Sequence, residues 1–134
     1  MTIKGMNITF TRNPAMPKEH NAALEFIAQK VETAGSRYCA YHDTDNRACG
    51  VGWMMSRETR RQIKKEGENS CRIASLVHDH FGQFGKTSEF ESEMGMSLKI
   101  IREIQETFDR VINRPHDYPE PHKEIAKRIR AMQV

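Results

Sequence analysis

The most regular feature of the chain is an apolar stripe between Leu98 and Ile112. Apolar side chains recur there at intervals of three or four residues, with charged side chains between them. That spacing places the apolar residues on one face of an α-helix. The stripe therefore predicts a helix over 97–113. We expect its apolar face to lie in the core of the domain; pairing with a second copy, which would make a dimer, is the alternative.

Weaker patterns of the same kind predict four more helices. Pro17 suits the first turn of a helix and Gly35 suits a helix end, while Ser56 suits an N-cap before a basic segment. Ser88 and Glu91 have the spacing of a capping box, which predicts a short helical turn before Gly95. The four expected helices cover 16–34, 57–66, 71–82 and 122–132.

The stretch RYCAYHDTDNRACGVGW, residues 37–53, predicts the β-structure of the chain. Residues 38–41 and 48–54 have strand-compatible composition, and the polar residues between them favour a turn. Gly50 and Gly52 would share one face of the second strand, where small residues let another element approach closely. The predicted fold class is therefore α+β: about five helices packed around one small antiparallel β-hairpin.

Length and composition favour a single domain over residues 1–134. A chain of 134 residues can form one core without disulfides or metals. Residues 1–13 are expected to form an N-terminal strand or arm, and the glycine-containing segment 82–95 a mobile loop. No apolar run approaches the ~20 residues that span a bilayer, so we expect no membrane partner.

The cysteines raise the question of a metal site. Cys39, His42 and Cys49 lie close together in the sequence, and Cys71 could complete a tetrahedral zinc site. Structural zinc sites typically use ligand pairs with two to four residues between them, and no two cysteines here have that spacing. We interpret the three cysteines as buried thiols of a reduced protein without a cofactor, and a zinc module or metal-dependent enzyme remains an alternative.

The sequence favours binding over catalysis. It contains neither a phosphate-binding glycine loop nor a nucleophile elbow. Two basic clusters are present instead, one on the helix expected over 57–66 and one near the C-terminus. Like charges four residues apart repel each other on a helix, which indicates an anionic partner. The clusters consist of Arg57, Arg60, Arg61, Lys64 and Lys65, and of Lys123, Lys127, Arg128 and Arg130.

Aromatic side chains are expected to add contacts beside the first cluster. We expect Tyr41, Trp53 and Tyr118 to be exposed, since exposed aromatic residues anchor many interfaces. The opposite interpretation is that the basic residues form a solvated face, balanced within the chain by the acidic run from Glu89 to Glu93. The predicted binding residues are Tyr41, Trp53, Arg57, Arg60, Arg61 and Lys64.

Two short motifs resemble a family of small accessory proteins encoded by tailed phages and prophages. Cys39-Ala40-Tyr41, a polar turn and Ala48-Cys49-Gly50-Val51-Gly52 resemble the family's Cys-Ala-Tyr … Ala-Cys-x-Val-Gly pattern. A second, weaker similarity lies in the late helix, at Ile101, Ile104, Gln105 and Asp109. Where the family often has a cysteine after the second glycine, this chain has Trp53.

The resemblance implies a non-enzymatic phage accessory protein. Such a protein would bind and modulate a host or anti-phage-defence component, either a protein or a small anionic ligand, in the cytoplasm of an infected bacterium. The resemblance supplies no catalytic residues. Nucleic acid is an alternative partner, since the chain has a net charge of +3. The protein is expected to be a monomer or a dimer.

Overall fold

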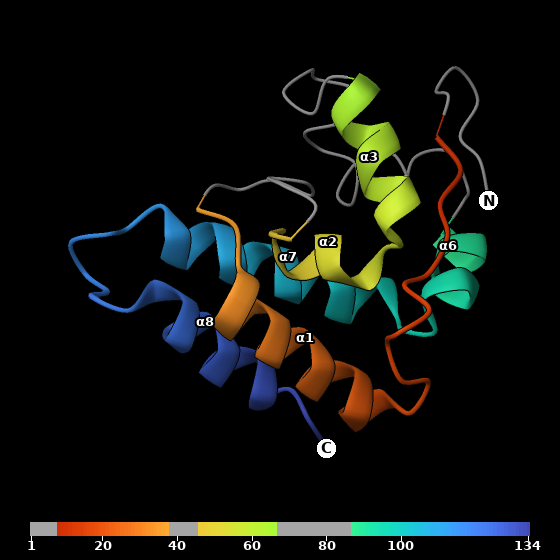
Figure 1. Cartoon of the computed structure of the whole chain (residues 1–134). Coiled ribbons are helices and arrows are strands. Elements are labelled where there is room, and N and C mark those ends of the chain that lie inside the picture. The colour runs from red at the N-terminus through yellow and green to blue at the C-terminus, as the bar shows by residue number, and fades with distance from the viewer. Residues whose placement is uncertain (1–7, 38–45, 67–86) are drawn as a thin grey trace.

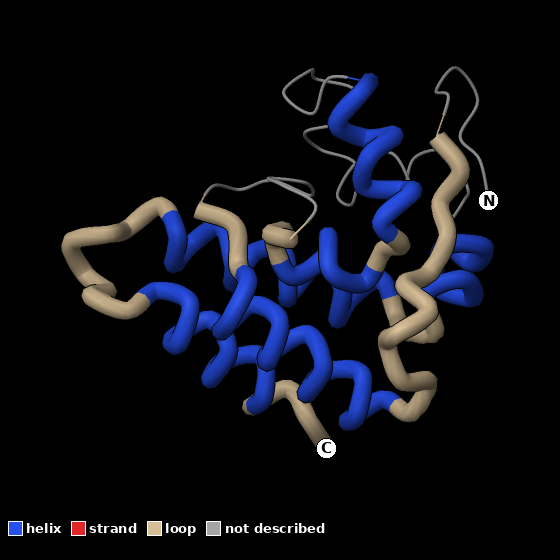
Figure 2. The backbone as a smooth tube through the Cα atoms, viewed as in Figure 1, coloured by secondary structure: helices blue, strands red, loops and turns tan. Residues whose placement is uncertain are grey.

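The computed structural model describes residues 8–37, 46–66 and 87–134. This part of the chain contains helices and loops but no strand (Figure 2). The helices are α1 (His20–Ala34), α2 (Gly50–Met54), α3 (Arg57–Glu66), α6 (Thr87–Met94), α7 (Leu98–Ile112) and α8 (Pro121–Arg130).

Helices α1 and α8 lie side by side although they come from opposite ends of the chain (Figure 1). Helix α7 packs against α8, and the short helix α2 packs against both α1 and α7. Helix α3 extends away from this group (Figure 1). None of these helices has the length and apolar character that crossing a bilayer requires. The core is therefore an arrangement of helices, with α3 at its margin.

Helix α7 confirms the prediction made from the apolar stripe. Leu98, Ile101, Ile104, Phe108 and Val111 are all buried. The first turn is stabilised from two sides, because Ser97 Oγ accepts from Ile100 N at 3.4 Å and Glu91 Oε2 accepts from Leu98 N at 2.7 Å. The stripe is thus buried inside one chain and does not form a surface for a second copy.

Helix α1 begins later than the expected residue 16. Glu19 is its N-cap, and its carboxylate accepts hydrogen bonds from Asn21 N at 3.0 Å and Ala22 N at 2.7 Å. These bonds lower the pKa of Glu19, the one to Ala22 most. Pro17 therefore lies before the helix and not in its first turn. The helix ends at Ala34, as Gly35 predicts.

The predicted hairpin is wrong, and with it the α+β fold class. Residues 50–54 of the expected second strand form helix α2. Ala48 pairs with the end of α1, because Ser36 N donates to Ala48 O at 3.0 Å and Ala48 N donates to Ala34 O at 3.3 Å. The expected first strand, 38–41, lies outside the described residues. The described fold is helix-rich without a sheet.

Burial explains why residues 50–54 are helical despite their strand-compatible composition. All five are buried, and Cys49 Sγ caps the helix by accepting a hydrogen bond from Gly52 N at 3.4 Å. A Cβ atom on Gly50 would lie 2.6 Å from Ile104 Cγ2 of α7. The small residues therefore do allow close packing, as the sequence predicts, but on a helix.

The described end of the N-terminal arm lies along the α2–α3 junction. Asn13 N donates to Met54 O and Ser56 N donates to Thr11 O, both at 2.9 Å. Phe10 is completely buried beside them. Only an isolated bridge between Arg12 and Met55 forms here, so residues 8–13 are an ordered arm and not a strand. Residues 1–7 lie outside the described part.

The other expected elements are partly described. Helices α3 and α8 confirm the predictions for 57–66 and, within a residue or two, 122–132. The helix expected over 71–82 lies outside the described residues, as do residues 82–86 of the expected mobile loop. Residues 87–94 of that loop form α6, which confirms the short helical turn predicted before Gly95.

Candidate anion-binding site

Helix α3 is attached to the arm through three hydroxyl groups. Ser56 Oγ accepts from Thr59 N at 3.2 Å, and Thr11 Oγ1 lies 2.5 Å from Ser56 Oγ. Thr59 is completely buried and donates through Oγ1 to Thr9 O at 2.7 Å. Buried Ile63 anchors the next turn. The inner side of α3 is therefore fixed against the rest of the protein.

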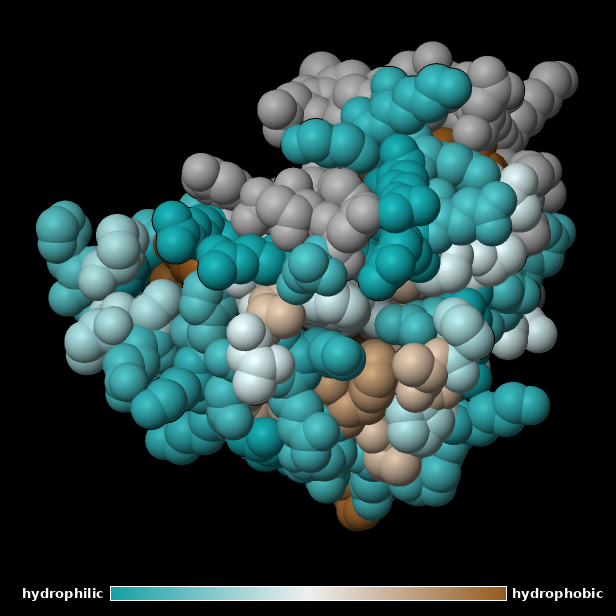
Figure 3. Space-filling view, in the orientation of Figure 1, coloured by the Kyte–Doolittle hydropathy of each residue, from teal (hydrophilic) through white to brown (hydrophobic). Residues whose placement is uncertain are grey.

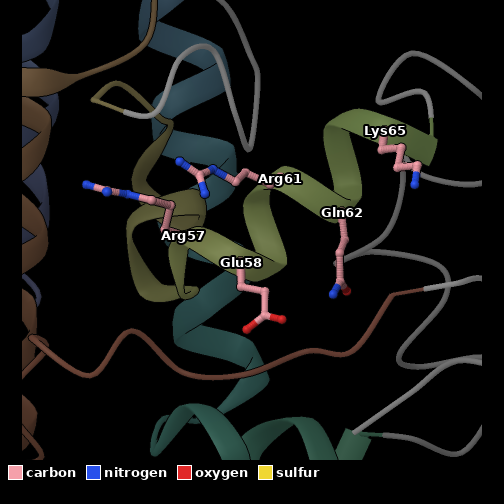
Figure 4. Close-up of a pocket in the computed structure, with 5 residues that line it drawn as sticks. All are labelled: Arg57, Glu58, Arg61, Gln62 and Lys65. Carbon is pink, nitrogen blue, oxygen red and sulfur yellow. The ribbon is translucent and has the colours of Figure 1, made fainter.

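Four cations occupy the outer side of α3, and we call them the α3 basic face: Arg57, Arg61, Lys64 and Lys65. All four are exposed. Arg57, Glu58, Arg61, Gln62 and Lys65 line a shallow hollow of about 530 Å³. Figure 4 shows Arg57 and Arg61 extending to one side of the helix, while Glu58 and Gln62 extend to another. Gln62 is engaged, since its Oε1 accepts from Thr9 N at 2.7 Å.

A second hollow, of about 440 Å³, lies where α1, the arm and the α2–α3 junction meet. We call it the Trp53 hollow. Its lining includes Phe26 and Lys30 of α1, Trp53 of α2, and Arg57, Glu58 and Arg60 of α3. Figure 3 shows hydrophilic residues over α3 and a less polar patch over α1 and the segment before it. The site thus combines cations with apolar surface.

Trp53 is not the exposed aromatic residue that the sequence predicts. Only 7% of it is exposed. Its Nε1 donates to Ala34 O at 3.1 Å, and Asn13 Nδ2 donates to Trp53 O at 2.9 Å. Both bonds satisfy polar groups that burial would otherwise leave costly. Trp53 is therefore a wall of the hollow and not a protruding contact.

Arg60 also departs from the prediction, because it is 3% exposed. Its guanidinium carbon lies 4.7 Å from the centre of the Trp53 ring, and Lys30 Nζ lies 5.1 Å from the same centre. Cations are attracted to the face of an indole ring. Arg60 therefore packs against Trp53, and it belongs to the hollow instead of the outer face.

The C-terminal basic cluster is largely neutralised. Arg130 pairs with Glu25 at 3.0 Å and with Glu32 at 2.9 Å. Hydrogen bonds from Arg130 to Glu32 and Glu25 raise the pKa of the guanidinium. Two more of its cations are paired locally, Arg128 with Glu124 of α8 at 3.3 Å and Lys123 with the N-cap residue Glu120 at 3.0 Å. Half-buried Tyr118 accepts a hydrogen bond from Arg128 at 2.9 Å, so it too is engaged.

The α3 basic face differs from that cluster. Among the described residues, no carboxylate forms an ion pair with Arg57, Lys64 or Lys65. Two of the acids proposed as an internal counterweight act elsewhere, because Glu91 caps α7 and Glu93 Oε1 accepts from Arg12 N at 3.0 Å. Arg57, Lys64 and Lys65 of the α3 basic face are therefore exposed cations without a carboxylate partner in the described part of the chain.

The metal candidates are not brought together in the described part. Cys49 is completely buried at the start of α2, and its Sγ donates to Gln105 Oε1 at 3.8 Å. No group of three metal-ligating side chains occurs among the described residues. Cys39, His42 and Cys71 lie outside them, as does the predicted binding residue Tyr41. Cys49 thus matches the buried thiol that the sequence predicts.

The described part of the first motif, Ala48 to Gly52, contacts the second motif in α7. Cys49 contacts Gln105, and Gln105 Nε2 donates to Asp109 Oδ1 at 2.9 Å. Gly50 lies against Ile104 in the same contact. These motif residues therefore have a packing role at the α2–α7 contact, and they lie apart from the α3 basic face.

Sequence reasoning missed Phe26 and Lys30 as residues of the site. The Lys30 ammonium lies 5.7 Å from the centre of the Phe26 ring. The signal available was their spacing, since residues four apart are neighbours on a helix. Their proximity to α3 could not be read from the sequence, because it depends on the way α2 turns back onto α1.

Comparison with known proteins supplies no family for the chain: no family model, no curated protein and no solved structure matches it.

Proposed function

We propose that this protein is a non-enzymatic phage accessory protein whose α3 basic face binds an anionic group of a host or anti-phage-defence component. The infected bacterial cytoplasm is its proposed location. The observation that carries the binding proposal is the contrast between two basic clusters of one chain. The C-terminal cluster is largely paired with carboxylates, whereas Arg57, Lys64 and Lys65 have no carboxylate partner among the described residues.

Physical reasons support binding through this face. Arginine presents a planar set of donors that matches carboxylates and phosphates. Fixed cations also accelerate encounter with an anionic partner by electrostatic steering. Because α3 is held by buried Thr59 and Ile63, its cations are presented on a positioned helix. The phage assignment itself is supported by the motif resemblance alone.

A charge-reversal experiment tests the proposal. Arg61→Glu combined with Lys65→Glu changes two exposed cations four residues apart on α3. Lys123→Glu combined with Lys127→Glu makes the same change in net charge, at the same spacing, on α8. Partners are recovered with tagged protein from phage-infected cells and identified by mass spectrometry. We expect the α3 variant to recover at least tenfold less of the specific partner than the parent, and the α8 variant to recover as much as the parent. Phage growth should be reduced by the α3 variant more than by the α8 variant.

Equal partner recovery by the parent and both variants would reject the α3 basic face as the binding surface. Circular dichroism and thermal unfolding of each variant show whether the fold is kept. Arg60 is left unchanged in these variants, since reversing a buried charge against Trp53 would disturb folding.

Nucleic acid is the second candidate, because Arg57, Arg61 and Lys65 form a row that spans ~12 Å along α3. For binding of this kind, the logarithm of the association constant falls linearly with the logarithm of the salt concentration. The slope is about −0.9 for each phosphate contacted on duplex DNA. A gel shift at low salt that disappears as salt is raised would favour it. Absence of any shift at low salt would exclude it.

A further inference from the structure

The Trp53 hollow is large enough to hold a small molecule. Its volume of about 440 Å³ lies within the ~300–1,000 Å³ that is typical of ligand sites. Its walls come from three separate parts of the chain: the arm, α1 and the α2–α3 junction. The hollow therefore depends on the tertiary structure, unlike the shallow surface along α3 alone.

Aromatic rings hold cations at this hollow. Lys30 Nζ lies 5.1 Å from the Trp53 ring centre and 5.7 Å from the Phe26 ring centre, and Arg60 contacts the Trp53 ring as well. Trp53 is itself anchored to Ala34. Groups positioned before binding lose less conformational entropy when a ligand arrives. The hollow is therefore preorganised for an anion.

The charge of the lining matches a phosphate ester. Lys30, Arg57 and Arg60 contribute three positive charges, and Glu58 contributes one negative charge. A phosphomonoester carries about −1.5 to −2 at neutral pH, which balances the remaining charge better than a single carboxylate would. Neither Lys30 nor Arg57 forms an ion pair with a described carboxylate.

The other lining groups narrow the class of ligand. Half-buried Phe26 and exposed Pro14 offer apolar surface to a flat ring. The Glu58 carboxylate can accept hydrogen bonds from hydroxyl or amino groups. Phosphate, a flat ring and hydroxyl donors occur together in a nucleotide.

We infer that the Trp53 hollow binds a nucleoside monophosphate, or a small molecule of the same chemistry, with its phosphate at Lys30 and Arg57 and its ring against Phe26 and Pro14. This inference rests on the proposed function and specifies the anion that the site recognises. It uses Lys30 and the α1 side of the hollow, which the α3 charge-reversal experiment leaves intact.

The single tryptophan makes the site directly observable. The full chain is titrated with each of the four ribonucleoside 5′-monophosphates, with inorganic phosphate and with adenosine. Trp53 fluorescence and titration calorimetry report binding. We expect a saturable change with at least one nucleotide, and at least tenfold weaker binding of phosphate and adenosine, since each supplies only part of the ligand.

Matched variants assign the binding to the hollow. Lys30→Gln and Arg57→Gln are each expected to weaken nucleotide binding at least tenfold, whereas Lys127→Gln on α8 leaves it unchanged. Absence of both a fluorescence change and binding heat at millimolar nucleotide would overturn the inference. Equal binding of phosphate and nucleotide would reject the ring contact, and equal binding by Lys30→Gln and Lys127→Gln would reject the location.

The two proposals can fail separately. If no nucleotide binds but Arg61→Glu with Lys65→Glu still loses the partner, the hollow inference fails and the proposed function stands. If nucleotides bind but the Arg61→Glu with Lys65→Glu variant keeps the partner, the hollow inference stands and the α3 basic face is rejected as the partner-binding surface. If neither result is obtained, both proposals are rejected.

Discussion

Gly50 shows how one missing side chain determines a contact between helices. A Cβ atom there would lie 2.6 Å from Ile104 Cγ2, 3.7 Å from Ile27 Cγ2 and 3.8 Å from Ile129 Cδ1. The first distance is far shorter than a normal carbon–carbon contact, and the other two are ordinary contacts. Side chains from α1, α7 and α8 thus converge on this one position. Glycine is required there by close approach, not by an unusual backbone conformation.

We predict that Gly50→Ala destabilises the protein by roughly 1–2 kcal/mol. An exposed glycine in a helix would gain about 1 kcal/mol from the same change, whereas overpacking a core costs about 1–3 kcal/mol. Urea unfolding followed by circular dichroism measures the difference. In an Ile104→Leu background, which removes the clashing Cγ2 while conserving volume, the cost should be smaller. A Gly50→Ala protein as stable as the parent would show that α2 and α7 are not in close contact.

Arg60 and Arg61 are adjacent in sequence but differ in role. Arg60 is 3% exposed and lies over the Trp53 ring, whereas Arg61 is exposed beside Arg57 in Figure 4. Consecutive residues on a helix point in different directions, so neighbouring cations of a basic run can differ in whether they face the protein or the solvent. The sequence identifies the run, and the packing of α3 separates the two kinds.

At the scale of elements, the corner between α6 and α7 depends on its loop residue. Gly95 follows α6 with φ of 70°, the left-handed region that glycine adopts without strain. Its N–H donates to Glu91 O at 2.8 Å, and the Glu91 carboxylate caps α7 at Leu98. One turn of α6 therefore orders both the end of one helix and the start of the next.

We predict that Gly95→Ala destabilises the protein by about 1 kcal/mol, the usual cost of a left-handed conformation for an alanine. Gly95 is exposed, and the nearest side-chain atom to an added Cβ is Arg12 Cζ at 4.0 Å, so no clash contributes. Gly95→Asn serves as the control, because asparagine tolerates this conformation better and should cost less. Thermal unfolding shows which of the two variants is more stable. A Gly95→Ala protein at least as stable as the Gly95→Asn protein would contradict the prediction.

Helix α2 illustrates the limit of local preferences. Its five residues include two glycines, a valine and a tryptophan, none of which favours a helix strongly. A helix this short is not stable alone in water. It forms because its residues are buried against α1 and α7, and because the Cys49 thiol satisfies the Gly52 N–H.

At the scale of the whole molecule, the contact between α1 and α8 joins the C-terminus of the chain to the start of α1. Arg130 joins Glu25 and Glu32 of α1, and Val134 N donates to Asn21 Oδ1 at 2.9 Å. The C-terminus accordingly lies near the start of α1 (Figure 1). These polar contacts border the apolar contact between the two helices and make it sensitive to pH.

We predict that acid weakens the α1–α8 contact. Burial raises the pKa of Glu25, but hydrogen bonds from Arg130 and Gln133 outweigh it and lower the pKa from its ordinary value of 4.5. A carboxylate with a lowered pKa in the folded state contributes stability above its unfolded pKa and loses that contribution as the pH falls through the folded pKa. The Tm should therefore fall as the pH is lowered from about 5 toward 3.

Glu25→Gln isolates this effect. The variant should be less stable than the parent at pH 7. The difference should shrink as the pH falls through the folded pKa of Glu25, because the parent carboxylate then gains a proton and loses its charge. Arg130→Met should likewise reduce the acid dependence by removing the partner. An equal decrease in Tm with acid for the parent and for Glu25→Gln would show that Glu25 does not contribute.

The sequence by itself determined the helices with a strong local signal. The stripe of α7, the Ser56 cap of α3 and the Gly35 end of α1 are local patterns, so they could be predicted without knowing what the helices touch. The basic residues of α3 were also evident. A candidate binding face could therefore be named, but not its exposed members.

Only the tertiary structure decided the rest, because the deciding contacts join residues far apart in the chain. Residues 50–54 are helical through packing on α1 and α7, although their composition favours a strand. The C-terminal cations are largely paired with carboxylates, two of them on α1, whereas Arg57, Lys64 and Lys65 of α3 have no carboxylate partner among the described residues. Trp53 and Arg60 are buried for the same reason, and Lys30 joins the hollow only because α2 folds back onto α1.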